Sequence, residues 1–428
     1  MKEFDILLGF FLMPKYQSSL GFFPILSYSN YISRNHVSQT PRILCPWGFL
    51  IFSGEVKRMT DQEYMALALQ LAQGTSGQTS PNPMVGAVVV KDGKIVGMGA
   101  HMCAGEEHAE VHALHMAGER AKGATVYVTL EPCSHFGKTP PCCELLIEKG
   151  VQRVVIATLD CNPLVSGNGK RRLEETGIEV TTGVLEAEAT LLNRYFFHYM
   201  KTKRPFVTIK TAMSLDGKTA TVTGESQWIT GEEARADVHQ YRHMHDAILV
   251  GVNTVLTDNP HLTTRIPNGG KHPIRVILDT HLRTPPSSHV ITDGLAPTWI
   301  IVGKDVNKEK IASYESNNIA VFQMKTQQIE IQDVLSLLGE KQILSLFVEG
   351  GQTVHANFLK TNSFNEIVTY ISPKLIGGKD APTLFGGAGF SKLQDALSLT
   401  IQEMKQIGND IKIVATLKSE VTECLQES

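Results

Sequence analysis

The positions of hydrophobic and polar residues change several times between a helical period and strand-like runs after residue 60. Thr60 and Glu63 form a capping-box pattern ahead of a helical apolar period, which predicts a helix over 61–73. The pair Asp92-Gly93 separates two strand-like runs and predicts a hairpin. The other elements expected in this half are helices at 108–121, 143–150, 170–177 and 185–200, and strands at 85–90, 95–100, 124–130, 151–159 and 178–184.

A second series of elements follows the polar segment KTKRP at 201–205. Alternating helices and strands are typical of layered α/β domains, so we predict two such domains, over 59–203 and 204–428. Neither half has a G-x-G-x-x-G after its first strand, which excludes a standard Rossmann fingerprint. In the second half we expect a helix at 231–243, a helix starting near 353, and strands at 206–214, 247–251, 273–279, 298–303, 343–351, 364–371 and 410–417.

The first 58 residues do not continue this pattern, and we interpret 1–58 as an N-terminal extension. Its apolar stretch at 6–13 is much shorter than the roughly 20 residues of a membrane-spanning helix, and its acidic start does not suit a signal peptide. Because Met59 directly precedes the capping box, we expect translation to start there and the extension to be disordered or untranslated. The alternative is a genuine leader, which a native peptide spanning 57–60 would support.

The composition indicates a globular protein and excludes some classes of partner. The chain has 428 residues, of which 42% are hydrophobic, and its formal net charge is −3. These values are typical of a globular protein and give no basic field for nucleic acid or an anionic membrane, so we expect neither as a partner. The seven cysteines are an odd and clustered set, which indicates metal or catalytic use in a reducing cytoplasm rather than disulfides.

The candidate chemistry of the first half gathers in an H-x-E … P-C … C pattern formed by His108, Glu110, Cys133 and Cys142. Zinc deaminases have this pattern, except that here eight residues instead of two separate the cysteines. One imidazole and two thiolates leave a fourth tetrahedral position for a water, whose pKa zinc lowers to about 7. Glu110 is not a ligand and suits general acid–base catalysis. Cys142 is expected to begin a helix whose dipole favours its thiolate.

Other interpretations of these residues stay open. His108 and His112 have the spacing of H-E-x-x-H metalloproteases, but Ala109 takes the place of the glutamate. A structural zinc site would need a fourth ligand, for which His135 or Cys143 is available. The cysteines that we expect to be packed thiols are Cys45, Cys103, Cys143, Cys161 and Cys424.

Two rival functions also follow from the pattern. A nucleic-acid or nucleoside deaminase would use the same metal chemistry, but the near-neutral charge gives no basic surface for a nucleic-acid strand. A zinc-stabilised interaction protein would keep the ligands without catalysis. Glu110 argues against that class, because a purely structural site has no need of an acid there.

Longer motifs in both halves resemble a known family, the bacterial bifunctional riboflavin-biosynthesis deaminase–reductases. Its deaminase half is similar to TSPNPMVGAVVVKDG, AGEEHAEVHALHMAG and VTLEPCSHFGKTPPCC. Its reductase half is similar to KTAMSLDGKTATVTGESQWIT, GVNTVLTDNPHLTTR, FVEGGQTVHANFL and SPKLIGGKDAPTLFGG. The resemblance runs from about residue 59 to about residue 417 and implies a cytidine-deaminase-like α/β/α layered domain followed by a dihydrofolate-reductase-like α/β domain.

The resemblance implies two consecutive reactions. The first is zinc-dependent deamination of 2,5-diamino-6-ribosylamino-4(3H)-pyrimidinone 5′-phosphate. The second is NADPH-dependent reduction of the ribosyl group, which gives 5-amino-6-ribitylamino-uracil 5′-phosphate. The partners would then be small phosphorylated pyrimidines, and we expect a homo-oligomer in the cytoplasm.

Site residues follow by matching these motifs. Asn82 is expected to contact the pyrimidine and Lys138 the substrate phosphate or carbonyl, with a turn-forming asparagine and a solvated lysine as the alternatives. Met84 stands where the family often has asparagine, and Lys210 would polarise the sugar carbonyl or imine. The cofactor contacts would be Ala212, Trp228, Thr254, Asp258, Gly351, Gln352, Thr353, Val354, His355, Ala356 and Asn357. The substrate contacts in the second half would be Ser226, Arg242, Leu262, Arg265 and Glu349.

Two features of the residues themselves agree with these assignments. Gly350-Gly351 precedes an expected helix start, where unhindered backbone amides suit the pyrophosphate of a dinucleotide. Arg242 and Arg265 suit a phosphate because a guanidinium binds it through two hydrogen bonds. A tight turn and surface ion pairs are the alternatives for these two features.

Overall fold

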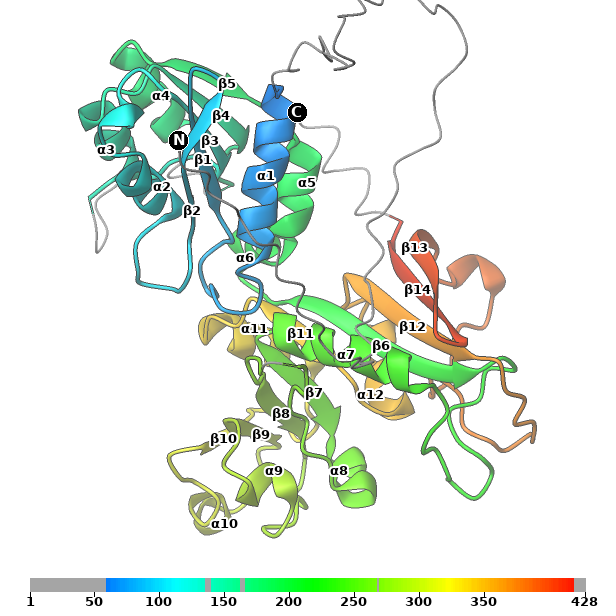
Figure 1. Ribbon diagram of the computed structural model, residues 1–428. Coiled ribbons are helices and arrows are strands. Elements are labelled where there is room, and N and C mark those ends of the chain that lie inside the picture. Colours follow the sequence, from blue (N-terminus) through cyan, green and yellow to red (C-terminus); the bar gives the residue numbers. More distant parts are fainter. Residues whose placement is uncertain (1–58, 135–139, 162–165, 268, 419–428) are drawn as a thin grey trace, which may run out of the picture. The chain divides into compact units, whose positions relative to one another are not determined.

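The computed structural model describes residues 59–134, 140–161, 166–267 and 269–418 (Figure 1). Within them the strands form two separate sheets, one of five strands and one of nine. The interpretation of residues 1–58 and the role given to Lys138 lie outside the described residues. No helix in the described ranges combines the length and the apolar character that a membrane span needs.

The first sheet has the strand order β2-β1-β3-β4-β5. β1 (Gly86–Lys91) and β2 (Lys94–Ala100) form the predicted antiparallel hairpin. Asp92 and Gly93 take the positive φ values, 51° and 74°, that its tight turn requires. β3 pairs antiparallel with β1, and the parallel strands that follow are β3 (Thr125–Leu130), β4 (Arg153–Thr158) and β5 (Glu179–Thr182).

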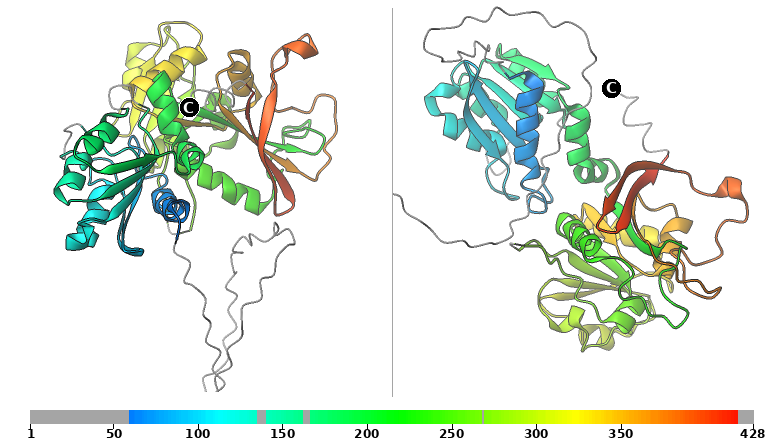
Figure 2. Two further views of the ribbon diagram at one scale, coloured as in Figure 1. Left: turned by 90° about the horizontal axis from the view of Figure 1, so that it is seen from above. Right: turned by 45° about the vertical axis from the view of Figure 1, so that its right-hand side comes forward.

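Helices cover both faces of this sheet, as predicted (Figures 1 and 2). α1 (Asp61–Gln73) begins at the predicted capping box and shares a hydrophobic core with α5, whereas α2 (Ala109–Ala117) belongs to the core on the other face. α2 lies directly on β2, since a Cβ atom at Gly97 would be 2.1 Å from the carbonyl oxygen of Ala113. The other helices are α3 (Cys142–Glu148), α4 (Asn168–Glu175) and α5 (Glu186–Leu192).

The helix predicted over 185–200 is instead two helices, α5 and α6 (Arg194–Thr202). Asn193 lies between them and is 2% exposed. Its side chain accepts a hydrogen bond from the backbone N–H of Met84 at 2.8 Å and donates one to the Met84 carbonyl at 2.9 Å. The chain therefore bends at Asn193, where the buried side-chain amide forms hydrogen bonds with the backbone of Met84. The apolar period of the surrounding sequence does not indicate this bend.

The second sheet has the strand order β10-β9-β8-β7-β11-β6-β12-β14-β13. Neighbours are parallel from β10 to β12, and β14 and β13 are added antiparallel. The strands are β6 (Phe206–Ser214), β7 (Ala247–Gly251), β8 (Ile274–Leu278), β9 (Thr298–Val302), β10 (Ile319–Gln323), β11 (Ser345–Val348), β12 (Glu366–Ser372), β13 (Leu399–Ile407) and β14 (Asp410–Leu417).

Helices also cover both faces of the second sheet. α7 and α8 share one hydrophobic core, and α11 and α12 share the other. The helices are α7 (Glu232–Met244), α8 (Val252–Asp258), α9 (His289–Thr292), α10 (Lys308–Ala312), α11 (Ile331–Glu340) and α12 (Gln352–Lys360). The predicted α/β class is confirmed for both halves. The strand predicted over 343–351 is too long, because the chain leaves the sheet after Val348 to begin α12.

His245, which follows α7, gives the stability a pH dependence. Its Nδ1 atom lies 2.8 Å from the Tyr241 carbonyl oxygen, its Nε2 atom lies 3.0 Å from the Thr208 hydroxyl, and the residue is fully buried. Burial lowers the pKa of His245 to about 4, whereas an unfolded histidine has a pKa near 6.5. Between these values the unfolded chain binds the additional proton, so the stability present above about pH 6.5 is lost as the pH falls towards 4.

In wild type, His245 contributes about 1.4 kcal/mol per pH unit to the fall in the free energy of unfolding within this window. We expect His245→Gln to remove that contribution and so make the fall less steep. Urea unfolding at several pH values within this window measures the slope. His115→Gln removes an exposed histidine and is the matched control, with the wild-type slope expected. Identical slopes for wild type and His245→Gln would contradict the assignment.

Candidate functional site

Three candidate metal ligands lie close together near the carboxyl end of β3, the central strand of the first sheet. His108 directly precedes α2, Cys133 follows β3, and Cys142 is the first residue of α3. The Nδ1 atom of His108 lies 3.2 Å from the Cys142 sulfur and 3.6 Å from the Cys133 sulfur, and all three ligand atoms lie within 4.8 Å of one another. Tetrahedral zinc bonds of about 2.1 Å to nitrogen and about 2.3 Å to sulfur place N and S roughly 3.5 Å apart. The three residues therefore fit a zinc ion.

The two cysteines share a proton when no metal ion binds them. Hydrogen bonds from the thiol of Cys142 and from its backbone N–H, whose nitrogen lies 3.2 Å from the Cys133 sulfur, lower the pKa of Cys133 to about 4. The pKa of Cys142 is raised by this hydrogen bond and by burial. The backbone N–H at this helix start donates to the Cys133 sulfur, and the prediction that the helix start favours the Cys142 thiolate in the metal-bound site stays a prediction. A bound divalent metal requires both groups as thiolates and releases the shared proton.

Glu110 lies beside this cluster on the first turn of α2. Its side chain is 3% exposed, and burial together with the negative charge of Cys133 raises the pKa of the Glu110 carboxyl. A hydrogen bond links this carboxyl to the thiol of Cys142. A buried carboxyl that takes up a proton readily, directly beside the metal ligands, is suited to general acid–base catalysis.

His101 belongs to this site, although the sequence did not indicate it. Its Nδ1 atom lies 3.1 Å from the Glu107 carbonyl oxygen and must donate to it, so its Nε2 atom accepts from the Asn82 side-chain amide at 3.1 Å. Its ring packs edge-on against His108, with 5.5 Å between the centroids. The structure thereby connects Asn82 to the metal ligands through one residue. The position of His101 directly after the predicted strand at 95–100 was the only feature of the sequence that could have indicated its place in the site.

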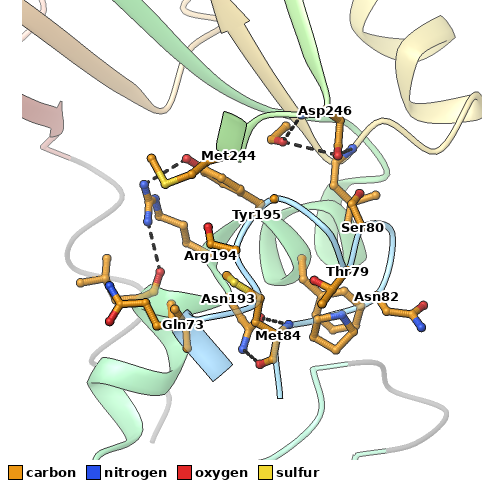
Figure 3. Close-up of a pocket in the computed structure, with 18 of the residues that line it drawn as sticks. Gln73, Thr79, Ser80, Asn82, Met84, Asn193, Arg194, Tyr195, Met244 and Asp246 are labelled. Carbon is orange, nitrogen blue, oxygen red and sulfur yellow. Dashed lines mark hydrogen bonds between the residues drawn. The ribbon is translucent and has the colours of Figure 1, made fainter. Parts of the chain in front are cut away.

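Asn82 also borders a cavity of about 380 Å³. Figure 3 shows Asn82 and Met84 on the segment that follows α1, with Asn193 beside them. The hydrogen bonds between Asn193 and Met84 involve only the backbone of Met84. These two backbone hydrogen bonds do not depend on the side chain at position 84. Methionine at this position, where the family often has asparagine, therefore keeps them.

Among the described residues, the other cysteines and histidines lie outside the metal cluster. Cys143 is fully buried and donates to the Pro132 carbonyl oxygen at 3.2 Å, and burial raises the pKa of Cys143 to about 12. Cys103 is exposed, so the prediction of a packed thiol is wrong there, because the loop between β2 and α2 leaves it uncovered. His112 lies 3.7 Å from the Glu107 carboxylate. The positions that lie outside the described residues are Cys45, His135 and Cys424.

Glu131 anchors Asp160 and the start of α4 next to the segment that carries a metal ligand. Its carboxylate is 5% exposed and accepts hydrogen bonds from the backbone N–H groups of Asp160 at 3.1 Å, Gly167 at 3.0 Å and Lys170 at 3.0 Å. The chain continues directly from Glu131 to Pro132 and the ligand Cys133. This carboxylate therefore ties Asp160 and the start of α4 to the strand end that carries one ligand.

We expect Glu131→Ala to lower the free energy of unfolding by about 3 kcal/mol, because three backbone N–H groups lose their acceptor. Glu131→Gln keeps one oxygen and should give an intermediate loss. Glu144→Ala removes an exposed carboxylate paired with Arg172 and is the control, with a much smaller effect expected. Urea unfolding compares the variants, and equal stability of Glu131→Ala and Glu144→Ala would contradict the role.

A largely buried charged cluster in the second sheet lies where β11 ends, beside Lys210 in the middle of β6. Arg242 donates to both carboxylate oxygens of Glu349, at 2.6 and 2.9 Å, and also to the Thr263 carbonyl oxygen at 3.0 Å. Burial opposes ionisation of Glu349, but the charge and hydrogen bonds of Arg242, aided by the charge of Lys210, lower its pKa to about 2. Burial lowers the pKa of the Lys210 ammonium. The structure thus brings together three residues that the sequence assigned to one substrate.

Arg265 and Leu262 lie close to this cluster on the segment after α8. The backbone N–H of Arg265 donates to His239 at 3.2 Å, and burial and repulsion by Arg242 lower the pKa of the Arg265 guanidinium. Leu262 is 3% exposed and has a φ of 53°, which fixes the turn ahead of Arg265. Among the described residues, the guanidinium of Arg265 has no ion pair. It is therefore available to an anion.

Apart from Trp228, the predicted cofactor residues fall on three elements of the second sheet and its helices. Ala212 lies on β6 and Thr254 and Asp258 on α8, while the segment 351–357 begins α12. A Cβ atom at Gly351 would meet no atom within 4 Å, so the helix start is open. Val354 and His355 point into the protein, since they are 8% and 5% exposed. The backbone amides at the helix start, rather than those two side chains, are therefore the groups that a phosphate can reach.

Ser226 and Trp228 lie apart from these elements in sequence, on the long segment between β6 and α7. Trp228 is 61% exposed, and the Arg235 guanidinium lies 4.8 Å from the centroid of its ring. Lys374 donates to the Trp228 carbonyl oxygen at 2.7 Å. Arg235 thus contacts the indole and Lys374 the backbone of Trp228, and most of the residue's surface stays free to contact a ligand.

Known families match both halves of the chain. The cytidine and deoxycytidylate deaminase zinc-binding region matches residues 58–158, and the RibD C-terminal domain matches residues 205–413. The riboflavin biosynthesis protein RibD of Bacillus amyloliquefaciens is 54% identical over 360 residues, which cover 84% of this chain and 96% of that protein. The protein of the same name from Escherichia coli (strain K12) is 43% identical over 365 residues, which cover 82% of this chain and 98% of that protein.

Solved structures agree with the sequence relatives. The diaminohydroxyphosphoribosylaminopyrimidine deaminase/5-amino-6-(5-phosphoribosylamino)uracil reductase of Thermotoga maritima is 36% identical, with a TM-score of 0.76 and coverage of 83% of this chain and 98% of that one. A structure of Acinetobacter baumannii RibD is 38% identical, with a TM-score of 0.76 and coverage of 84% and 99%. The chain therefore belongs to the RibD family of riboflavin biosynthesis proteins, with a zinc-binding deaminase region followed by a reductase domain.

Proposed function

We propose that this chain catalyses two consecutive reactions on one phosphorylated pyrimidine. The part over 59–203 deaminates 2,5-diamino-6-ribosylamino-4(3H)-pyrimidinone 5′-phosphate with zinc, and the part over 204–428 uses NADPH to reduce the product's ribosyl group to ribityl. The observation that carries the proposal is the buried Glu110 beside the zinc-compatible His108, Cys133 and Cys142, in a chain that also holds the Arg242–Glu349–Lys210 cluster. The activity named for the Thermotoga maritima relative supports the substrates.

In the deaminase, zinc would be held by His108, Cys133 and Cys142, and would supply Lewis-acid activation of the attacking water. Glu110 accepts a proton from that water and returns it to a ring nitrogen of the pyrimidine. A second proton transfer through the same carboxyl lets the amino group leave as ammonia, so water enters and ammonia departs. His101 fixes the side-chain amide of Asn82, whose oxygen then remains free to contact the pyrimidine.

In the reductase, the two arginines take different roles. Arg242 is committed to Glu349, so it holds that carboxylate in one orientation. Arg265 has an uncommitted guanidinium, and it binds the substrate phosphate through two hydrogen bonds. Lys210 lies in the buried cluster with Glu349 and polarises the sugar carbonyl or imine as hydride is delivered to its carbon. NADPH would be held by the amides at Gly351 and would supply that hydride.

The full-length chain tests both activities in one assay series. Ammonia release from the diaminopyrimidine phosphate should require zinc, and NADPH consumption should require the deaminated product. Omitting the first substrate and supplying the deaminated product directly separates the two reactions. Absence of ammonia release by the zinc-loaded protein would contradict the deaminase, and absence of NADPH consumption with the product supplied would contradict the reductase.

We further infer a homo-oligomer in the cytoplasm. Exposed apolar side chains gather on the terminal hairpin of the second sheet, where Ile401 and Met404 on β13 are 61% and 68% exposed and Ile411 on β14 is 40% exposed. An edge strand with such residues is suited to cover by a second copy. The cysteines of the described residues are free thiols, which agrees with a reducing compartment. Sedimentation analysis of the purified chain tests the oligomer.

A further inference from the structure

The segment after α8 carries Arg265 outside any regular hydrogen-bonded element. Between Asp258, the last residue of α8, and Ile274, the first residue of β8, the described residues include no helix or strand. Thr263 and Thr264 are nevertheless 4% and 5% exposed, so the backbone of this segment needs hydrogen-bond partners within the protein. Side chains must supply these partners, because no strand ladder or helical turn is available.

Two side chains of α7 hold the segment by its backbone. Arg242 donates to the Thr263 carbonyl oxygen at 3.0 Å. The Nδ1 atom of His239 accepts a hydrogen bond from the backbone N–H of Arg265 at 3.2 Å. His239 and Arg242 are three positions apart on the same helix, where such residues are neighbours. One face of α7 therefore supports the segment immediately before Arg265 and at Arg265 itself.

His239 is a neutral hydrogen-bond acceptor. Because its Nδ1 atom accepts, the ring proton must lie on Nε2. Burial and the positive charges of Arg242 and Arg265 lower the pKa of His239 to about 4, so the ring is neutral at neutral pH. A protonated ring would carry an N–H on both nitrogens and could no longer accept from the Arg265 amide. The neutral ring keeps this contact and leaves the positive charge to the arginines.

The side chain of Arg265 extends from this held backbone. The residue is exposed, and its guanidinium has no ion pair among the described residues, whereas the charge of Arg242 is neutralised by Glu349. A long side chain loses conformational freedom when it binds a ligand, and a fixed starting point reduces that loss. The hydrogen bond to His239 fixes the point from which the guanidinium of Arg265 reaches an anion.

We propose that His239 is a positioning residue of the reductase, which holds Arg265 where its guanidinium meets the 5′-phosphate of the substrate. This inference rests on the proposed reduction and on the proposed phosphate contact of Arg265. In this role His239 acts through the backbone of Arg265 rather than on the reacting atoms. Its loss should therefore raise KM for the phosphorylated substrate and leave kcat nearly unchanged.

Steady-state reduction by the full-length protein tests this role. NADPH is in excess, and the deaminated product is supplied either with its 5′-phosphate or after dephosphorylation. His239→Leu removes the acceptor and should raise KM for the phosphorylated substrate about tenfold, because a misplaced guanidinium loses part of a charge-assisted contact. KM for the dephosphorylated substrate should change by less than about twofold. His239→Asn should restore most of the affinity, since its Oδ1 atom can accept the same N–H.

Two further comparisons separate this role from a general loosening of the domain. In an Arg265→Ala background, His239→Leu should have no additional effect on KM, because both residues act through one contact. His243, one residue after Arg242 on α7, accepts from the backbone N–H of Lys271 at 3.0 Å. His243→Leu removes this similar hydrogen bond further along the segment and should raise KM for the phosphorylated substrate by less than about threefold.

The pattern of the two KM values decides the assignment. Equal increases for both substrates with His239→Leu would overturn it, as would an undiminished effect of His239→Leu in the Arg265→Ala background. If His239→Leu does not fold, His239→Gln gives the same test, because its amide lies one bond further from the backbone. Equal KM values of wild type for the two substrates would contradict the phosphate contact and this role. No NADPH consumption by wild type would instead contradict the proposed reductase.

Discussion

Glu110→Gln should slow ammonia release by a factor of about 10²–10⁴. The amide keeps the shape of the buried side chain but cannot accept a proton from water or pass one to the leaving amino group. The three ligand residues do not change, so zinc content should stay at one ion per chain. NADPH consumption with the deaminated product supplied should also stay at the wild-type rate, because the reductase uses other residues.

Metal analysis and the two separate assays check this result. Glu107→Gln, which changes an exposed carboxylate near the same helix, is the matched control and should keep most of the deaminase activity. Ammonia release by zinc-loaded Glu110→Gln within tenfold of wild type would show that another group moves the proton. Loss of zinc together with activity would show that Glu110 supports the ligands rather than the chemistry.

Arg242→Met should both destabilise the second domain and stop reduction. It leaves the carboxylate of Glu349 buried without its partner, which costs about 3–5 kcal/mol for a buried ion pair. The low pKa of Glu349, about 2 against about 4.5 when unfolded, gives a second signature. A lowered folded pKa contributes stability above the unfolded pKa, and that contribution is lost as the pH falls from about 4.5 towards 2.

Urea unfolding at neutral and acidic pH measures both effects. In Arg242→Met the loss of stability on acidification over this window should be reduced, because the carboxylate no longer has a favourable charged state. The double variant Arg242→Met/Glu349→Gln should recover part of the stability and none of the reductase activity. Arg242→Met with wild-type stability at neutral pH would contradict a buried pair, and an active double variant would contradict a role in reduction.

The sequence predicted the elements with strong local signals. The capping box at Thr60 and the Asp92-Gly93 turn depend only on neighbouring residues, so both were confirmed within a residue or two. The break at Asn193 was missed because its cause is a hydrogen bond to Met84, 109 positions away. β13 was also missed, since an edge strand with mostly exposed residues lacks the apolar alternation of a buried one.

The candidate metal site was more accessible to prediction than the site in the second sheet. Its ligands are rare residue types in a fixed order, and the structure brings together His108, Cys133 and Cys142. The proton distribution between the thiols was not accessible, because it depends on which sulfur receives the helix-start amide. The ion pair between Arg242 and Glu349 could not be predicted without the fold either, since these residues are 107 positions apart.

The contact of Gly97 with α2 limits how laboratory evolution can change the deaminase. The helix that follows His108 and carries Glu110 lies on β2 with no space for even one methyl group at this position. A library randomised at Gly97 and selected for riboflavin prototrophy should return glycine almost alone. New substrate shapes must then come from the loops at 74–84 and 101–107, while the catalytic helix keeps one fixed distance from the sheet.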